Sequence, residues 1–302
     1  MSDTTKPHPL PYGVAPPAFR LPDASHVGGV HLQVVDLQRS RSFYEQVLGL
    51  RADPIADSSI ALSADGEDRP LLTLHTRPAL TPARRGALGL YHFALLLPER
   101  SDLGHFASHL ASFEIRVAMA DHSVSEALYL WDPDGLGIEV YADRPRDTWR
   151  RHDRELEMTT DPLNIQSVIA AGRGTVWKGA PKGTTMGHVH LHVGNLEQAE
   201  AFYHRALGFD KTVWSYPGAL FMSAGGYHHH LGTNIWSQRP AASAEEARLL
   251  EWELMVPSVA DVEAAGRSAR DGGYGVEPRE DGIVVADPWG TRVHIRGGSL
   301  SV

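Results

Sequence analysis

Hydrophobic and polar residues alternate near the start of the chain, along Gly28-Gly-Val-His-Leu-Gln-Val-Val. A period of two predicts a half-buried β-strand. The strand pattern ends at Asp36, a residue type that caps helices, and an amphipathic segment follows with Ser42-Phe-Tyr and a closing Leu48-Gly-Leu. The pattern therefore predicts a strand, a helix and a glycine turn.

The same text returns in the second half of the chain. It begins at Gly187, with His-Val-His-Leu-His-Val after it, and Asn195 takes the place of the capping aspartate. Ala201-Phe-Tyr and Leu207-Gly-Phe then repeat the helix and its glycine turn. Self-similarity at a fixed offset is the signature of an internal repeat.

A second and fainter pair keeps the same offset. Tyr91-His-Phe-Ala-Leu-Leu-Leu-Pro corresponds to Leu250-Glu-Trp-Glu-Leu-Met-Val-Pro, and each precedes a helical segment. Each then reaches a turn, Asp132-Pro-Asp-Gly or Asp287-Pro-Trp-Gly, that introduces an alternating final strand. The chain is therefore predicted to contain two further copies of the unit.

We predict an α+β fold built from four copies of one small strand-helix-strand module. Modules one to four span about 27–76, 88–143, 187–236 and 249–297. The predicted organisation is a proline-rich extended arm at 1–26, a first region at 27–143, a connecting segment at 144–186 with a short helix around Leu163–Ala171, and a second region at 187–297.

The composition limits the metal ligands and the classes of partner that the chain can have. The chain has 302 residues, a net charge of −9 and no cysteine, so a transition metal would need nitrogen and oxygen ligands. No Lys/Arg cluster provides the footprint that nucleic acid requires. The chain has no apolar stretch of membrane-spanning length, and its N-terminal arm lacks the apolar core of a signal peptide. We expect a cytoplasmic protein with a small-molecule partner, no nucleic-acid partner and no membrane partner.

The repeated text resembles the vicinal-oxygen-chelate superfamily, which includes glyoxalases, bleomycin resistance proteins and extradiol dioxygenases. The resemblance rests on His188-Val-His-Leu-His-Val, Phe202-Tyr and the closing Asp-Pro-x-Gly with its Ile-Glu strand, and it covers nearly the whole chain after residue 26. Four modules in one chain, the stretch from His122 to Pro145 and Gly225-Gly-Tyr-His-His-His are similar to bacterial catechol-2,3-dioxygenases among the extradiol enzymes. This likeness implies four βαβββ modules.

In this superfamily a metal is held by residues on the first and fourth strands of two paired modules. The corresponding positions are Gly29 and Thr73 in module one, His92 and Glu139 in module two, His188 in module three with His228-His229-His230 near its fourth strand, and Glu251 and His294 in module four. Two histidines and one carboxylate form a facial set for Fe(II). Either His92, Glu139 and His188, or His188, Glu251 and His294, would supply that set.

Neighbouring residues favour the first set. The family places a tyrosine ten residues before its glutamate ligand and a histidine somewhat earlier; here Tyr129 stands ten residues before Glu139, and His122 stands seven before Tyr129. The position ten before His294 is Val284. We therefore expect the metal site between modules two and three. A lone strand histidine is usually a hydrogen-bonded core or surface residue, so the prediction depends on the equivalent positions in the repeat.

The resemblance also implies an acid-base histidine beside the metal. Alignment favours His229, whereas strand parity would select His228 or His230, and we expect at least one of these three to be only a surface residue. His190 and His192 share the face of His188, where they either line the site or pack inside a polar interior. Core packing is the expected role of Trp131, Trp177, Trp214 and Trp236.

The implied activity is extradiol ring cleavage in aromatic catabolism. A non-haem Fe(II) centre would insert both atoms of O2 into a catechol and give a 2-hydroxymuconic semialdehyde-type product, and Mn(II) accepts the same ligands. His229, His122 and Tyr129 would be the catalytic residues, and we expect a homo-oligomer. The alternatives are a metal-dependent glyoxalase-like lyase or isomerase, which normally uses two carboxylates, and a metal-free small-molecule binding protein.

Overall fold

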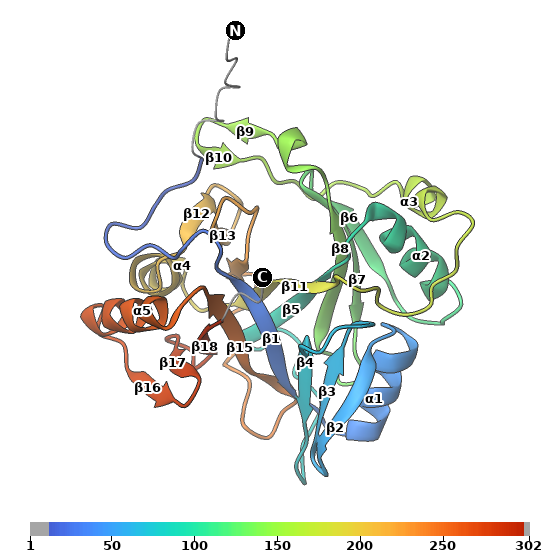
Figure 1. Cartoon of the computed structure of the whole chain (residues 1–302), viewed down its shortest axis with the longest axis horizontal. Helices are drawn as coiled ribbons and strands as arrows, with labels where there is room; N and C mark the ends of the chain where they lie inside the picture. The colour runs from blue at the N-terminus through green and yellow to red at the C-terminus, as the bar shows by residue number, and fades with distance from the viewer. Residues whose placement is uncertain (1–11, 299–302) are drawn as a thin grey trace, which may run out of the picture.

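Residues 12–298 are described by a computed structural model, and each predicted module is present as a βαβββ unit (Figure 1). Module one contains β1 (His26–Gln33), α1 (Leu37–Gln46), β2 (Arg51–Ala56), β3 (Ser59–Ser63) and β4 (Leu72–His75). Module two contains β5 (Gly89–Leu96), α2 (Arg100–Leu110), β6 (Ala118–Asp121), β7 (Ser125–Trp131) and β8 (Gly137–Asp143). The predicted α+β fold is confirmed.

The second half repeats the same order of elements. Module three contains β11 (Thr185–His192), α4 (Leu196–Ala199), η2 (Glu200–Ala206), β12 (Asp210–Val213), β13 (Ala219–Ser223) and β14 (Leu231–Asn234). Module four contains β15 (Arg248–Val256), α5 (Val259–Asp271), β16 (Val276–Arg279), β17 (Gly282–Ala286) and β18 (Arg292–Gly297). The internal repeat is therefore a structural repeat.

The helix signals act as their chemistry predicts. The Asp36 side chain accepts hydrogen bonds from two backbone N–H groups at the start of α1, and Asn195 caps α4 in the same way. Gly49 and Gly208 follow the helices with φ values of +67° and +89°, which glycine adopts without strain. One feature was not predicted: after α4 the helix continues as the π-helix η2, with a Leu207 N–H to Phe202 carbonyl bond of 2.9 Å.

The modules pair across the two halves of the chain. One eight-stranded sheet has the order β16-β17-β18-β15-β1-β4-β3-β2, and the other has β12-β13-β14-β11-β5-β8-β7-β6. Antiparallel pairing of β1 with β15 joins modules one and four, and antiparallel pairing of β5 with β11 joins modules two and three. The first and fourth strands of modules two and three therefore lie together at the centre of one sheet.

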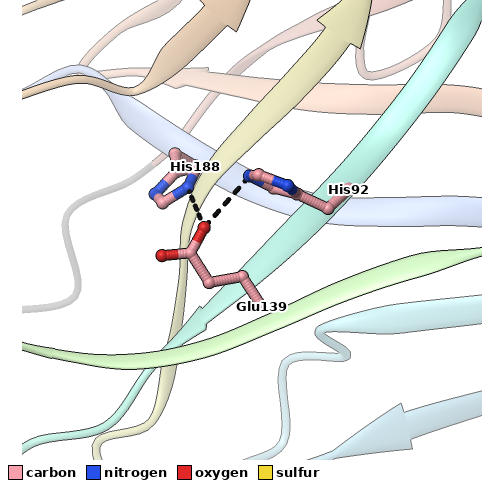
Figure 2. Close-up of side chains that lie close together, drawn as sticks. All are labelled: His92, Glu139 and His188. Atoms are coloured by element: carbon pink, nitrogen blue, oxygen red, sulfur yellow. Dashed lines mark hydrogen bonds and ion pairs between the residues drawn. The ribbon is translucent and has the colours of Figure 1, made fainter. Parts of the chain in front are cut away.

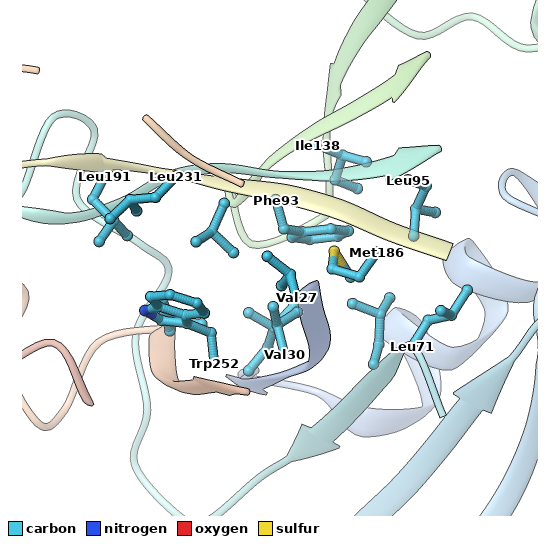
Figure 3. Packing of buried hydrophobic residues seen from close by; sticks show 14 of the residues in the cluster. Val27, Val30, Leu71, Phe93, Leu95, Ile138, Met186, Leu191, Leu231 and Trp252 are labelled. Carbon is cyan, nitrogen blue, oxygen red and sulfur yellow. The ribbon is translucent and has the colours of Figure 1, made fainter. Parts of the chain in front are cut away.

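The two curled sheets share one hydrophobic core (Figure 3). Trp252 and Val30 of one sheet and Phe93 and Leu191 of the other are completely buried in it. These residues lie on the strand faces opposite the ligand positions, because side chains alternate across a strand. The opposite face of each sheet carries the ligand positions and other polar residues.

Two further segments pack on this framework. The connecting segment contains η1 (Arg146–Thr148), β9 (Arg151–His152), β10 (Glu155–Leu156) and α3 (Ile165–Ala171), so the predicted short helix is confirmed. Residues 1–11 of the predicted arm lie outside the described residues. The rest of the arm runs along module three, where the Arg20 guanidinium donates to Asp210 at 2.8 and 2.6 Å. Between residues 12 and 298, no helix has the length and apolar character needed to cross a bilayer.

Candidate metal centre

Three side chains from the centre of the second sheet converge on one point (Figure 2). His92 comes from β5, Glu139 from β8 and His188 from β11. Nε2 of each histidine lies 3.0 Å from Glu139 Oε2, and all three side chains are buried. Among residues 12–298 this is the one group of at least three His, Asp or Glu side chains whose ligand atoms lie within 4.8 Å of one another. The structure thus brings together the three residues that the sequence favoured.

The protonation states of the three side chains suit the binding of a cation. Burial lowers the pKa of His92 and of His188, so that both rings are neutral near pH 7. Burial also acts to raise the pKa of Glu139, but its electrostatic interactions with His188 and His92 outweigh burial, and the pKa lies well below its usual value. The result is one carboxylate and two neutral imidazoles.

The residues fit a divalent metal. His92 Nε2 is buried and has no hydrogen-bond partner although it points at Glu139, and a buried polar atom of this kind is costly unless something else binds it. Two imidazole nitrogens and one carboxylate oxygen are the facial donor set of non-haem iron sites. A divalent cation between the three side chains would satisfy His92 and replace the close nitrogen-oxygen contacts.

A glycine allows the packing around His188. A Cβ atom on Gly187 would lie 1.8 Å from the Tyr141 hydroxyl oxygen, so any other residue would displace that ring. The Tyr141 ring instead lies 5.0 Å from the His188 ring, centroid to centroid. The glycine that begins the repeated strand text is thus required by a close approach beside the ligand.

A cavity of about 330 Å³ opens over the cluster. Its polar lining includes His122, Tyr129, His190 and His229, together with the ligands His92 and Glu139. This volume falls within the range of roughly 300–1,000 Å³ that is typical of small-molecule sites. The candidate metal centre therefore lies at a pocket with room for an organic ligand.

His122 and Tyr129 form a hydrogen-bonded pair on the cavity wall. The Thr159 carbonyl lies 2.6 Å from His122 Nδ1, and because a carbonyl only accepts, Nδ1 carries the proton. His122 Nε2 is then the acceptor for the Tyr129 hydroxyl at 2.6 Å. Burial raises the pKa of Tyr129 well above its usual value, so the hydroxyl stays protonated. Thr159 belongs to the connecting segment, to which the sequence assigned no role in the site.

The three consecutive histidines do not obey strand parity, because they lie in the irregular connection between β13 and β14. His229 lines the cavity with its ring 4.1 Å from the His188 ring, centroid to centroid. His228 is turned to Asp143, and His230 Nδ1 accepts from the Ala224 N–H at 3.2 Å. The expectation that at least one of them is a surface residue is wrong: all three are buried.

A chain of hydrogen bonds assigns the His229 tautomer. The Asp143 carboxylate accepts from His228 Nε2 at 3.0 Å, which leaves His228 Nδ1 as an acceptor. His229 Nδ1 lies 2.7 Å from that atom and must donate to it. Nε2 is therefore the unprotonated nitrogen of the His229 ring. Burial, with the neighbouring His188 and His228, lowers the pKa of His229 well below its usual value, so this neutral form persists near pH 7.

Other candidates take different places. His190 lines the cavity, and its Nε2 accepts from the Asn234 side-chain amide at 2.9 Å, which also bonds His192. The expected core packing holds for Trp177. It is wrong for the other three tryptophans, which are exposed: Trp131 and Trp236 line the cavity and Trp214 lies on the surface. The sequence assigned no cavity role to the two lining tryptophans and none to Asp143, because only their tertiary neighbours reveal one.

The alternative ligand set is not brought together. Glu251 and His294 belong to the first sheet and His188 to the second. His294 lies 3.7 Å from Glu251 and 3.1 Å from Asp281, while Arg292 and Arg279 approach the Glu251 carboxylate. The equivalent centre of the first sheet is also filled by Glu253, which accepts from the Gly29 N–H at 3.0 Å and from Arg296.

Two sheets of paired βαβββ modules, one with a His-Glu-His cluster under a cavity, define the class of protein. The chain belongs to the Glyoxalase/Bleomycin resistance protein/Dioxygenase superfamily, whose family model matches residues 24–140 and 185–295. The chain is also 42% identical over 271 residues to a protein named catechol-2,3-dioxygenase from Bacillus subtilis (strain 168), a match that covers 87% of this chain and 94% of that protein. The expected superfamily is confirmed.

Solved structures agree on the fold. A putative dioxygenase from Bacillus subtilis subsp. subtilis str. 168 has a TM-score of 0.66 and 16% identity, with 93% of this chain and 87% of that chain covered. Glyoxalase I from Zea mays has a TM-score of 0.55 and 16% identity, with 91% of this chain and 92% of that chain covered. At such identities the similarity shows the architecture alone.

Proposed function

We propose that this protein is an extradiol dioxygenase that cleaves a catechol-type ring. The observation that carries the proposal is the His92, Glu139 and His188 set beneath a cavity of about 330 Å³. The 42% identity to a protein named catechol-2,3-dioxygenase supports it. In the reaction the ring carbon–carbon bond beside the diol breaks, and both atoms of O2 enter a 2-hydroxymuconic semialdehyde-type product.

The metal would be Fe(II), and Mn(II) fits the same donors. When bound by the three ligands, it would hold the diol and dioxygen side by side and supply the redox chemistry. The cluster includes a single carboxylate, whereas a glyoxalase-like lyase or isomerase normally uses two. This donor set favours oxygen chemistry over proton transfer between carbons.

His229 is positioned to take a proton from the substrate diol. Its Nε2 is unprotonated because Asp143 and His228 fix the tautomer through bonds of 3.0 and 2.7 Å. A base whose hydrogen-bonding partner fixes the orientation of its ring is the usual arrangement in general base catalysis. Asp143 therefore acts as a positioning residue for His229.

Tyr129 would hydrogen-bond a substrate oxygen, and His122 would position its hydroxyl. The Tyr129 hydroxyl donates to His122 Nε2 at 2.6 Å, and His122 is held in turn by the Thr159 carbonyl, so the phenol oxygen is fixed on the cavity wall with its lone pairs available to a substrate hydroxyl. Groups preorganised in this way stabilise charge that develops in the transition state.

Metal content and oxygen uptake test the proposal. Purified protein loaded with Fe(II) or Mn(II) should bind close to one metal per chain and consume O2 with catechol to give a yellow product. His92→Ala, Glu139→Ala and His188→Ala should each lose the metal by elemental analysis, because two remaining ligands bind weakly.

His294→Ala is the matched control, since it removes a buried strand histidine from the other sheet. It should keep both metal and activity. Loss of metal in His294→Ala, or full retention in His188→Ala, would show that the site lies elsewhere. Absence of O2 uptake with every catechol in metal-loaded protein would reject ring cleavage.

A further inference from the structure

The mouth of the cavity gathers exposed apolar side chains. Among the described residues, eight large hydrophobic side chains are exposed, and four of these, Tyr91, Met119, Trp131 and Trp236, line this one cavity. They expose between 38 and 47% of their surface. Scattered exposed hydrophobes need no explanation, but a cluster of them around a pocket marks a binding surface.

The apolar surface continues from the mouth toward the metal ligands. Ring centroids follow one another at 5.7 Å from Tyr91 to Trp236, 6.3 Å from Trp236 to Tyr216, and 5.7 Å from Tyr216 to Phe221. The Phe221 ring then lies 5.0 Å from that of His229. These rings form an aromatic wall that lies beside both the acid-base histidine and the ligand His92, whose ring centroid is 4.9 Å from that of Tyr91.

The cavity lining is poorly suited to a negatively charged substituent. Within the described residues it contains neither lysine nor arginine. Two arginines lie outside the lining: the Arg116 guanidinium stacks on the Trp131 ring, 5.9 Å from the centroid, and Arg85 acts on Tyr91 through its charge. A carboxylate in an apolar pocket without a paired cation is strongly disfavoured.

The lining threonines are already hydrogen-bonded within the protein. Thr160 Oγ1 lies 2.8 Å from the Tyr216 hydroxyl, and Thr159 Oγ1 lies 2.9 Å from Ser123 Oγ. One hydroxyl proton of each pair is thus already donated to the other oxygen, and most of the remaining outer lining is aromatic or aliphatic. The outer cavity is therefore suited to dispersion and aromatic contacts.

We infer that the preferred substrate is a catechol with an uncharged apolar substituent, such as an alkyl or aryl group, that lies along this aromatic wall. The inference rests on the proposed function and specifies its substrate class. Burial of the substituent against Trp236 and its neighbours strengthens binding of the ring, whereas a carboxylate of the same size loses hydration without gaining a cationic partner from the lining within the described residues.

The test compares catechol, 4-propylcatechol and 3,4-dihydroxyphenylacetate, the last two being close in size and different in charge. With metal-loaded protein, kcat/KM for 4-propylcatechol should exceed that for the acid by about tenfold or more and should also exceed that for catechol. Anaerobic binding, followed by tryptophan fluorescence, should give the same order without turnover.

A matched pair of tryptophan variants tests whether the aromatic wall binds the ring substituent. Trp236→Ala should lower the ratio of kcat/KM for 4-propylcatechol over catechol several-fold, whereas Trp214→Ala should leave the ratio unchanged. Trp214 is the right control because it is also an exposed tryptophan, 38% exposed, and lies outside the cavity lining.

The outcomes separate the two proposals. O2 uptake with none of the three compounds rejects ring cleavage itself. Turnover in which the acid equals or exceeds 4-propylcatechol, or in which the propyl group brings no gain, overturns the substrate class and leaves ring cleavage standing. If Trp236→Ala changes the oligomeric state and lowers kcat/KM equally for catechol and 4-propylcatechol, the apolar mouth is an interface between copies of the chain and the inference is wrong.

Discussion

Around the cavity, hydrogen-bond partners determine which nitrogen of each histidine carries the proton. The Thr159 carbonyl sets the His122 tautomer, and Asp143 sets that of His229 through His228. Each partner is a pure acceptor, so the assignment follows from chemistry rather than from sequence position. His122 therefore accepts a hydrogen bond from Tyr129, whereas Nε2 of His229 is an unprotonated base.

At the residue scale we predict the effect of Tyr129→Phe. The change removes the hydroxyl bonded to His122 at 2.6 Å, so kcat/KM for a catechol should fall by about 10²-fold or more. Metal content should remain unchanged because the three ligands are intact. Tyr274→Phe, outside the cavity, is the control and should retain activity. An unimpaired Tyr129→Phe would remove this tyrosine from the mechanism.

At the scale of elements, the repeated Phe-Tyr pair of one module contacts the repeated Asp-Pro turn of the next module. The tyrosine of the Phe-Tyr pair in α1, Tyr44, donates to Asp132 in the turn of module two at 3.1 Å. Tyr203 donates in the same way to Asp287 in the turn of module four at 2.8 Å. All four groups are buried. These bonds link modules that are adjacent in the chain but belong to different sheets.

Substitution at either tyrosine tests this link. Tyr44→Phe and Tyr203→Phe should each lower the free energy of unfolding by about 1–3 kcal/mol, because a buried carboxyl loses a hydrogen bond. Urea titration measures the loss. Metal content and kcat should be nearly unaffected, since neither tyrosine lines the cavity. Unchanged stability in both variants would contradict a linking role.

On the scale of the whole molecule, the two sheets have diverged in what lies at their centres. The second sheet has a cavity over three ligand side chains, while the first sheet is filled by a charged network around Glu253. Burial acts to raise the pKa of Glu253, but bonds from His31 and the Gly29 N–H and the charge of Arg296 outweigh it and lower the pKa to about 2. Among the described residues, the candidate metal cluster thus belongs to the second sheet alone.

The lowered pKa of Glu253 makes stability depend on pH. A depressed carboxyl pKa stabilises the fold above the unfolded value near 4.5, and this contribution is lost as pH falls toward about 2. Glu253→Gln should cost about 3 kcal/mol at pH 7 and progressively less below about pH 4.5. Urea titrations from pH 7 to pH 3.5 measure the difference. Glu263→Gln, an exposed helix carboxylate, should show no such trend.

Much of the fold was accessible from sequence because its signals are local. Strand alternation, the Asp36 and Asn195 caps and the Gly49 and Gly208 turns are set by neighbouring residues, and the repeat multiplies each signal. Equivalent positions in the repeat also pointed to His92, Glu139 and His188 as a ligand set. The π-helical continuation of α4 has no such local signal, and it was missed.

By itself, then, the sequence determined four modules, their element order and the residue types available as ligands, since these depend on spacing along the chain. Only the tertiary structure decided that modules pair one with four and two with three, because strand pairing is a contact between distant segments. It also directed His228 to Asp143, and it brought Thr159, Trp131 and Trp236 to one cavity. Contacts between distant segments brought the site residues together, whereas the sequence determined which residue types were available there.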